Sequence, residues 1–300
     1  MRRKIFHNLV IISLFTAVSF TWGTTWMAMK IAVSSVPPIL ATGLRFLFAT
    51  PLLFLLSRYK QAPLLFPSSQ GLFQLYVTLF YFALPFTLMI YGERYIASGL
   101  ASIIFSIMPA IVLILSRFIL NERTTTQQIV GLWISISTLI IILWQEAHHN
   151  NLDTQIRGVL ALVAAVLIHA IMYVLCKKRC MTISVLSYNT LPCLGAGIIL
   201  TIAGLSETTD VKMFSTQSLL AIAYLGIVAS VGGVLAYFFL QKIIKPFQAS
   251  LVFMIFPLIA LTLERVINDS SLSKSSLVLL IPFLLGMILT LYKSKEKNSL

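Results

Sequence analysis

Apolar residues run along this chain in long blocks that short polar segments separate. The blocks are about as long as the 20-residue helix that crosses the hydrocarbon of a bilayer. Charged and turn-forming residues mark their ends. The pattern therefore predicts ten membrane-spanning helices with short connections, at residues 9–29, 38–57, 72–91, 98–119, 126–145, 157–176, 184–204, 217–240, 248–266 and 276–292.

One block is present twice. Residues 101–117 read ASIIFSIMPAIVLILSR, residues 249–265 read ASLVFMIFPLIALTLER, and nine of the seventeen aligned positions are identical. The copies lie in the fourth and ninth predicted spans, so each half of the chain contributes five helices. Because five is odd, the second half must enter the bilayer from the opposite side, as in transporters built from inverted repeats. We predict an all-α integral membrane protein in which two inverted five-helix repeats, 1–147 and 148–300, surround a central cavity.

Composition agrees with a chain that lies mostly in lipid. Hydrophobic residues make up 58% and charged residues 10%, against about 45–50% and about 25% in soluble domains. The net charge of +13 comes from short basic groups between apolar blocks, which argues against nucleic acid as a partner. With the N-terminus inside, fifteen Lys and Arg residues fall in inner segments and six in outer ones, and only Arg45 is left within a span. The positive-inside rule then predicts that both termini lie in the cytoplasm, and we expect a multi-pass protein of the inner (plasma) membrane.

Motifs for cofactors, metals and catalysis are missing from the sequence. The three cysteines have no further Cys or His at zinc spacing. No GxxxxGK[ST] loop is present for ATP, and neither HExxH nor GxSxG occurs. We therefore expect no cofactor, no metal site and no enzymatic activity. Any transport by this protein is expected to be independent of ATP hydrolysis.

Several longer sequence segments resemble those of a known protein family. In the first half these are WGTTWMAMK, PPILATGLRFLFA and GLASIIFSIMPAIVLILSRFILNERTTTQQIVG, and in the second half GVLALVAAVLIHAIMYVLCKK and YLGIVASVGGVLAYFFLQKIIKPFQASLVFMIFPLIALTLE. Over nearly its whole length the chain resembles the EamA family of the drug/metabolite transporter superfamily. The resemblance implies ten helices, cytoplasmic termini, a central cavity and transport of small metabolites, amino acids among them. The chain departs from the family pattern at Ser270, where an acid equivalent to Glu122 is expected, and at His169, where Trp is common.

Arg45 is the most informative single residue because it stands about eight residues into the second span. A charged side chain at the centre of a membrane helix costs about 2.5–3.5 kcal/mol on insertion scales, so a group that solvates it is required. A substrate carboxylate or phosphate held by two hydrogen bonds is one explanation. Backbone carbonyls released from a helix are the other.

Aromatic and polar side chains recur at related positions in the two halves. Trp22 and Trp26 are one helical turn apart, and His169 and Tyr173 repeat that spacing in the second half. These four are candidates for substrate binding, and packing between helices is the alternative. His169 titrates near neutral pH when unperturbed, so it is also the candidate for proton coupling; a plain hydrogen bond to a neighbour is the alternative. Weaker binding candidates are Tyr91, Tyr188, Asn189 and Tyr237.

Two prolines, Pro109 and Pro257, lie near the centres of the repeated helices. Each removes a backbone hydrogen bond to the carbonyl four residues earlier, which belongs to Phe105 or Phe253. We expect both kinks to line the cavity and to bend during transport, and a static kink is the alternative. Lys30 and Lys177 end their helices and are expected to extend to opposite membrane surfaces. Arg117 and Glu122 are expected as charges at the cytoplasmic end.

These features favour a secondary transporter that exports or exchanges amino acids or related anionic or zwitterionic solutes by alternating access. No carboxylate lies in the middle of a span, which disfavours a pump for cations. The alternatives are an importer of a nucleotide-linked metabolite such as S-adenosylmethionine, a multidrug exporter, and a structural membrane subunit that transports nothing. The expected partners are a small-molecule solute and the lipid bilayer. Proton coupling, and a monomer as opposed to a homodimer, are left open.

Overall fold

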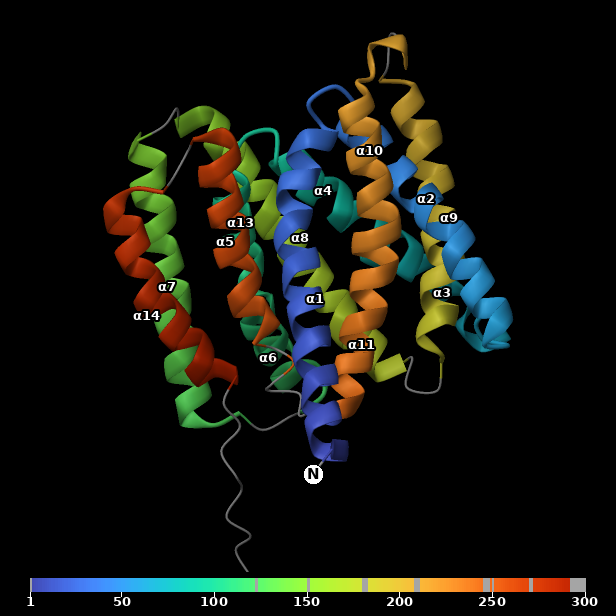
Figure 1. Cartoon of the computed structure of the whole chain (residues 1–300), viewed down its shortest axis with the longest axis horizontal. Helices are drawn as coiled ribbons and strands as arrows, with labels where there is room; N and C mark the ends of the chain where they lie inside the picture. Colours follow the sequence, from blue (N-terminus) through green and yellow to red (C-terminus); the bar gives the residue numbers. More distant parts are fainter. Residues whose placement is uncertain are drawn as a thin grey trace, which may run out of the picture.

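The computed structural model shows a bundle of long helices packed side by side (Figure 1). It describes residues 2–121, 124–149, 152–179, 183–207, 211–244, 249, 251–269 and 272–291. The longer helices are α1 (Arg2–Ala32), α2 (Pro38–Tyr59), α3 (Gly71–Tyr76), α4 (Leu84–Gly92), α5 (Ser98–Ser106), α6 (Met108–Ile119), α7 (Thr126–His149), α8 (Leu152–Arg179), α9 (Val185–Leu205), α10 (Thr216–Tyr224), α11 (Val234–Ile243), α13 (Val252–Asn268) and α14 (Lys274–Leu291).

The predicted spans correspond to these helices. Over the described ranges there is no strand, and nine helical segments are long and apolar enough to cross a membrane. The third predicted span is the continuous run Ser68–Gly92, which contains α3 and α4. The ninth predicted span is α13, which has 17 described residues. The prediction of an all-α, multi-pass membrane protein is confirmed.

Helices from the two halves pack in matching pairs. The second span, α2, packs against the seventh, α9, and the fifth span, α7, packs against the tenth, α14. The first span, α1, packs against α13 of the ninth, and the sixth span, α8, packs against α6 of the fourth. Exchanging the two halves therefore reproduces the same set of contacts, as a pseudo-twofold axis between repeats requires. The boundary between repeats at residues 147 and 148 stays a prediction.

Two π-helical segments interrupt the bundle at equivalent places. One segment is η2 (Val77–Ala83), between α3 and α4, and the other is η4 (Leu225–Gly233), between α10 and α11. Their first residues are 148 positions apart, which is the offset of the repeated sequence. In η4 the Ser230 hydroxyl donates to the carbonyl of Leu225 at 2.8 Å. Short π-helical insertions disturb the regular backbone ladder and are frequent at functional sites.

Glycines let the paired helices approach closely. A Cβ atom on Gly43 of α2 would lie 2.5 Å from the backbone nitrogen of Thr201 in α9. In the α7–α14 pair, a Cβ atom on Gly131 would lie 2.5 Å from the carbonyl oxygen of Gly286, and one on Gly286 would lie 2.8 Å from that of Gly131. Contacts this short exclude any larger residue unless the helices separate. Small residues at helix–helix contacts are a general feature of membrane bundles.

The two repeated prolines differ in their effect. The fourth span breaks at Ile107, between α5 and α6, and Pro109 stands in the first turn of α6. The Ile107 carbonyl accepts the backbone N–H groups of Ala110 at 3.0 Å and Ile111 at 3.2 Å, which begins the second helix. By contrast, α13 continues through Pro257. The bending of these helices during transport stays a prediction, and Glu122 and Ser270 lie outside the described residues.

Candidate functional site

Arg45 lies in the interior of the bundle, where it is 4% exposed. Its Nε donates to the hydroxyl of Ser230 at 2.9 Å, and its Nη1 lies 3.9 Å from the sulfur of Met29. The guanidinium carbon stands 4.7 Å from the centre of the Phe86 ring, a cation–π contact. Among the described residues no carboxylate forms an ion pair with Arg45. A guanidinium has five N–H donors, so the protein contacts leave several of them for a ligand.

His169 of α8 packs near the same Phe86 ring and is also buried, with 6% of its surface exposed. Its imidazole lies 5.1 Å from the ring of Phe86, 4.8 Å from Tyr81 and 5.9 Å from Phe105, all measured between ring centres. Its Nδ1 is buried and has no hydrogen-bond partner in the described part of the chain. A buried polar atom without a partner is uncommon in folded proteins and calls for an explanation. A ligand next to Arg45 would supply one.

The tryptophans predicted from the sequence extend this aromatic group towards α1 and α13. Trp26 is 5.4 Å from Phe105, and Trp22 is 4.8 Å from Tyr237 and 5.5 Å from Phe253. These contacts join side chains from α1, α5, α8, α11 and α13. We call the whole set the central cluster: Arg45, Trp22, Trp26, Tyr81, Phe86, Phe105, His169, Ser230, Tyr237, Phe253 and Phe256.

The other candidates are placed less centrally. Tyr188 reaches the edge of the cluster, 6.1 Å from Tyr81, and Tyr173 is partly buried among apolar side chains. Asn189 donates its amide to the Val185 carbonyl of its own helix at 2.6 Å. Tyr91 is not brought to the cluster.

The displacement of Tyr91 has a local cause. Tyr91 lies in the last turn of α4, at the end of the bundle where α1 finishes, and its hydroxyl accepts a hydrogen bond from the Tyr95 hydroxyl at 3.2 Å. Arg117 lies in the last turn of α6 and is exposed, as expected for a charge at a helix end.

The sequence analysis did not identify three residues of the central cluster: Ser230, Tyr81 and Phe86. The last two come from the run YFALPF of the third span, whose placement depends on the π-helical turn before α4.

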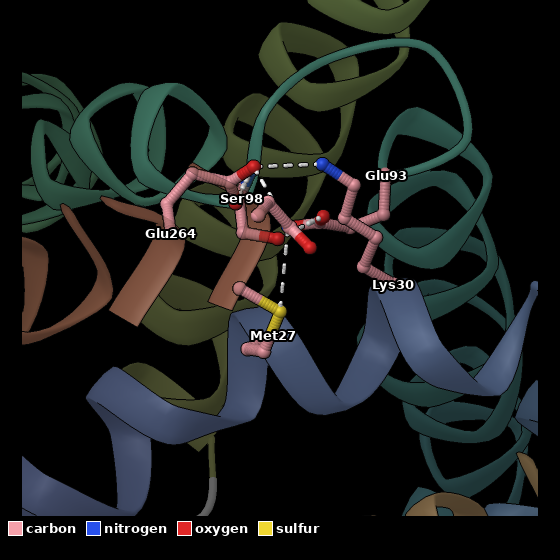
Figure 2. A network of polar contacts seen from close by, with 6 residues as sticks. Met27, Lys30, Glu93, Ser98 and Glu264 are labelled. Atoms are coloured by element: carbon pink, nitrogen blue, oxygen red, sulfur yellow. Dashed lines mark hydrogen bonds and ion pairs between the residues drawn. The ribbon is translucent and has the colours of Figure 1, made fainter. Parts of the chain in front are cut away.

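A second polar group lies at the end of the bundle where α1 finishes, at the top of Figure 1. We call this end of the molecule the Lys30 end, and Figure 2 shows the polar group. The Lys30 ammonium pairs with Glu264 Oε1 of α13 at 2.8 Å. Ser98, at the start of α5, donates its backbone N–H to Glu264 Oε2 at 3.0 Å and its hydroxyl to Glu93 Oε2 at 2.9 Å. Asn268 donates to Glu264 Oε1 at 3.0 Å. These five residues, the gate cluster, join α1, α5 and α13 to the end of α4.

This pairing corrects one expectation. Lys30 was expected to extend to the membrane surface, but its ammonium turns to Glu264 because a buried carboxylate requires a cationic or hydrogen-bonding partner. Lys177 at the opposite end is exposed, as expected.

A cavity of about 610 Å³ lies at the Lys30 end, bordered among others by Lys30, Arg94, Glu264 and Arg265. A shallower one of about 360 Å³ lies between α1, α10 and α13. Neither is lined by Arg45 or His169. Arg45 and His169 are buried away from both cavities, and the gate cluster stands beside the larger one.

A multi-pass helical bundle with matched halves and a charged residue buried inside it is an architecture found in membrane transporters built from inverted repeats. The chain belongs to the EamA-like transporter family, whose sequence profile matches residues 9–144 and 156–292. The family profile matches each half of the chain once, which confirms the resemblance seen in the sequence segments. Membership of this family also agrees with a protein that is not an enzyme.

Similar proteins cover most of the chain. Protein PagO of Salmonella typhimurium is 51% identical over 279 residues, 93% of this chain and 91% of that protein. An uncharacterized transporter of Buchnera aphidicola is 47% identical over 286 residues, 95% of each chain. The uncharacterized inner membrane transporter YedA of Escherichia coli is 25% identical over 262 residues, 86% of this chain and 83% of YedA. One crystal structure with 15% identity has the same fold, with a TM-score of 0.67 over 93% of this chain and 95% of the other.

Proposed function

We propose that this protein is a secondary transporter of the inner membrane that exports or exchanges amino acids or related anionic and zwitterionic solutes by alternating access. Both termini lie in the cytoplasm in this proposal, so the Lys30 end faces outward. The solute binds at the central cluster with its carboxylate on Arg45.

The observation that carries the proposal is the isolation of Arg45. It is buried, its Nε is used by Ser230, and no described carboxylate neutralises it. A planar guanidinium suits a carboxylate or phosphate because two parallel N–H groups match two oxygens. A charge that costs several kcal/mol to insert is a functional residue by default in a membrane protein. A solute carboxylate is the partner that this position lacks.

The rest of the central cluster suits the remainder of such a solute. The ring of Phe86 contacts the guanidinium, and ring-to-ring contacts continue from it through His169 and Phe105 to Trp26. Ligand sites often combine aromatic walls with a few polar groups in this way. His169 Nδ1 adds one unused polar atom. Amino acids combine a carboxylate with an apolar or polar side chain, so they match this mixture well.

The matched halves support alternating access. Arg45 donates a hydrogen bond to Ser230 of the π-helical segment η4, and it also contacts Phe86, which lies in α4 just after the counterpart segment η2. The two repeats thus contribute to the same guanidinium a residue of one π-helical segment and a residue that follows the other. Broken or irregular helices beside a central site are the elements that move in transporters with inverted repeats.

Counterflow in reconstituted vesicles tests the proposal. Vesicles are preloaded with one unlabelled solute, and uptake of the labelled solute is measured across amino acids, organic acids, S-adenosylmethionine and cationic drugs. We expect counterflow with a carboxylate-bearing solute and its loss in Arg45→Met, while the matched control Arg58→Met, at the exposed end of the same helix, keeps it. Counterflow of cationic drugs alone, or full activity of Arg45→Met, would overturn the proposed solute class.

A further inference from the structure

The gate cluster holds two buried carboxylates and one cation. Glu93 is 1% exposed and Glu264 is 3% exposed. The single lysine of the cluster, Lys30, contacts Glu264 at 2.8 Å. Because Ser98 donates to both acids, the two carboxyl groups share one small polar pocket (Figure 2). If both were ionised, the pocket would keep one negative charge without a counterion.

The hydrogen bonds distinguish the two acids. Glu264 accepts from Lys30, from Asn268 and from the backbone of Ser98, which suits an ionised carboxylate. Glu93 accepts only the Ser98 hydroxyl on Oε2, and its Oε1 is buried without a partner in the described residues. A buried charge that lacks donors is strongly disfavoured, whereas the neutral acid needs far less solvation.

The groups that face Glu93 favour its neutral form. Glu93 directly follows the third span, and burial raises the pKa of its carboxyl well above the ordinary value. The charge of Glu264 on α13 raises that pKa further, while Ser98 on α5 and Lys30 on α1 act in the opposite direction.

Among the described residues, Lys30 is the one cation that acts on Glu93. On the remaining side, α8 packs on Gly92 through Gly158 and Leu162. Arg94, which follows Glu93, borders the 610 Å³ cavity, and Arg94 and Arg157 lie close enough to Tyr91 to interact with it electrostatically.

We propose that Glu93 is a proton-binding site of the gate at the Lys30 end: the closed gate holds Glu93 as the neutral acid, and opening releases its proton to water at that end. The ligand is a single proton, and the only bond broken is the O–H bond of the carboxyl group. The inference rests on the alternating access proposed above, and it is distinct from His169, where the sequence alone suggested proton coupling. Lys30 and Glu264 of the gate cluster border the 610 Å³ cavity, and in this proposal the proton passes to water that enters there on opening.

The sign of the effect follows from linkage. In the open gate Glu93 meets water, and its carboxyl returns towards the ordinary pKa of about 4.3. Between that value and the raised pKa of the closed gate, opening releases a proton, so the ratio of open to closed molecules rises by up to about tenfold per pH unit. Outside this window the ratio is independent of pH.

The device belongs to one end of the molecule only. At the offset of 148 residues, Glu264 corresponds to Ser116 and Glu93 corresponds to Gln241. The opposite end therefore has neither acid of the pair. Proton binding at Glu93 therefore acts directly on the Lys30 end alone, and the other end responds to it only through the coupling of the two ends in alternating access.

A buried reporter tests the inference without any solute. Met27 is 3% exposed and lies beside the gate cluster, where Asn268 approaches its sulfur at 3.8 Å. Met27→Cys is made after Cys176, Cys180 and Cys193 are replaced by alanine, and its labelling by a membrane-impermeant maleimide is followed against pH. The same reporter is measured in Glu93→Gln, which copies the neutral acid. The quantity compared is the labelling rate in the parent background divided by the rate in Glu93→Gln. The ionisation of the thiol is the same in both proteins, so it cancels from this ratio.

We expect this ratio to rise by up to about tenfold per pH unit across the window and to flatten above it. Glu146→Gln is the matched control: Glu146 is buried and borders the same cavity but bonds to Ser273, so it should keep the full pH dependence. Infrared difference spectra supply an independent readout, in which the carbonyl stretch of a protonated carboxyl group should be present in the parent protein and absent in Glu93→Gln. A ratio that does not change with pH, or a protonated-carboxyl band that survives Glu93→Gln, would overturn the inference. Because no solute is involved, a protein that moved none of the tested solutes would still give a clear result here.

Discussion

Replacing Arg45 by methionine separates a binding role from a structural one. The guanidinium is 4% exposed and has one hydrogen bond to a protein oxygen, from Nε to Ser230. Removing a charge from the middle of a membrane helix returns about 2.5–3.5 kcal/mol on insertion scales. Losing one hydrogen bond made by a charged group costs about 1.5–3 kcal/mol. The two effects nearly cancel, so we expect Arg45→Met to insert and to melt close to the parent protein.

Transport should respond quite differently. A solute carboxylate left without its buried cation loses about 2–5 kcal/mol, most of it as the penalty of an unpaired charge. That corresponds to a half-saturation concentration raised by at least roughly 30-fold. Counterflow measured against solute concentration, with thermal melting of the same detergent-purified samples, provides both quantities. Arg45→Lys should recover only part of the affinity, since an ammonium lacks the planar pair of N–H groups.

The reasoning about Arg45 would be refuted by either of two results. One is an Arg45→Met protein with unchanged counterflow. The other is a large loss of melting temperature with normal affinity in the molecules that remain folded, which would make Arg45 a structural residue.

Three further predictions concern the packing and the moving parts. Gly43→Ala should destabilise the protein by about 1–3 kcal/mol and lower its melting temperature, because the added Cβ would meet the backbone of Thr201. Gly71→Ala is the control, since a Cβ there would have nothing within 4 Å. Equal melting of the two variants would contradict the close α2–α9 contact. Pro109→Ala restores a backbone N–H that the Phe105 carbonyl can accept, so it should slow turnover more than it weakens binding, and a changed affinity with normal turnover would show the opposite. Lys30→Met leaves Glu264 without its cation, so labelling of Met27→Cys should increase several-fold, while exposed Lys60→Met should have no effect; an unchanged rate in Lys30→Met would remove the ion pair from the gate.

The sequence was sufficient to predict the features that are repeated along the chain and those that carry a large free-energy cost in lipid. Apolar length located the spans, the copied segment around Pro109 and Pro257 indicated two matched halves, and the cost of a charge in lipid singled out Arg45. Trp22 and Trp26 were found by their spacing and do join the central cluster. Their role in binding, like that of Arg45, stays a prediction.

Contacts between distant segments were beyond the sequence. Lys30 and Glu264 are 234 positions apart, and nothing local marks them as partners. Ser230 reaches Arg45 from a π-helical turn, whose change of phase a regular helical period does not predict. Tyr91 stands away from the central cluster because it lies in the last turn of α4, at the Lys30 end, where its hydroxyl accepts a hydrogen bond from Tyr95.

The central claim is that two matched halves expose Arg45 to one side of the membrane at a time. The most direct measurement places a single cysteine beside it, Ser230→Cys, and adds impermeant maleimide to either side of oriented vesicles. The Lys30 end is then locked by a disulfide between Gly99→Cys and Leu261→Cys, formed before the reporter is labelled; the two positions touch in this structure. The account predicts labelling from both sides in the unlocked protein and from the opposite side alone once the lock is closed. Labelling from the Lys30 side that persists with the lock closed, or from neither side in the unlocked protein, would contradict it.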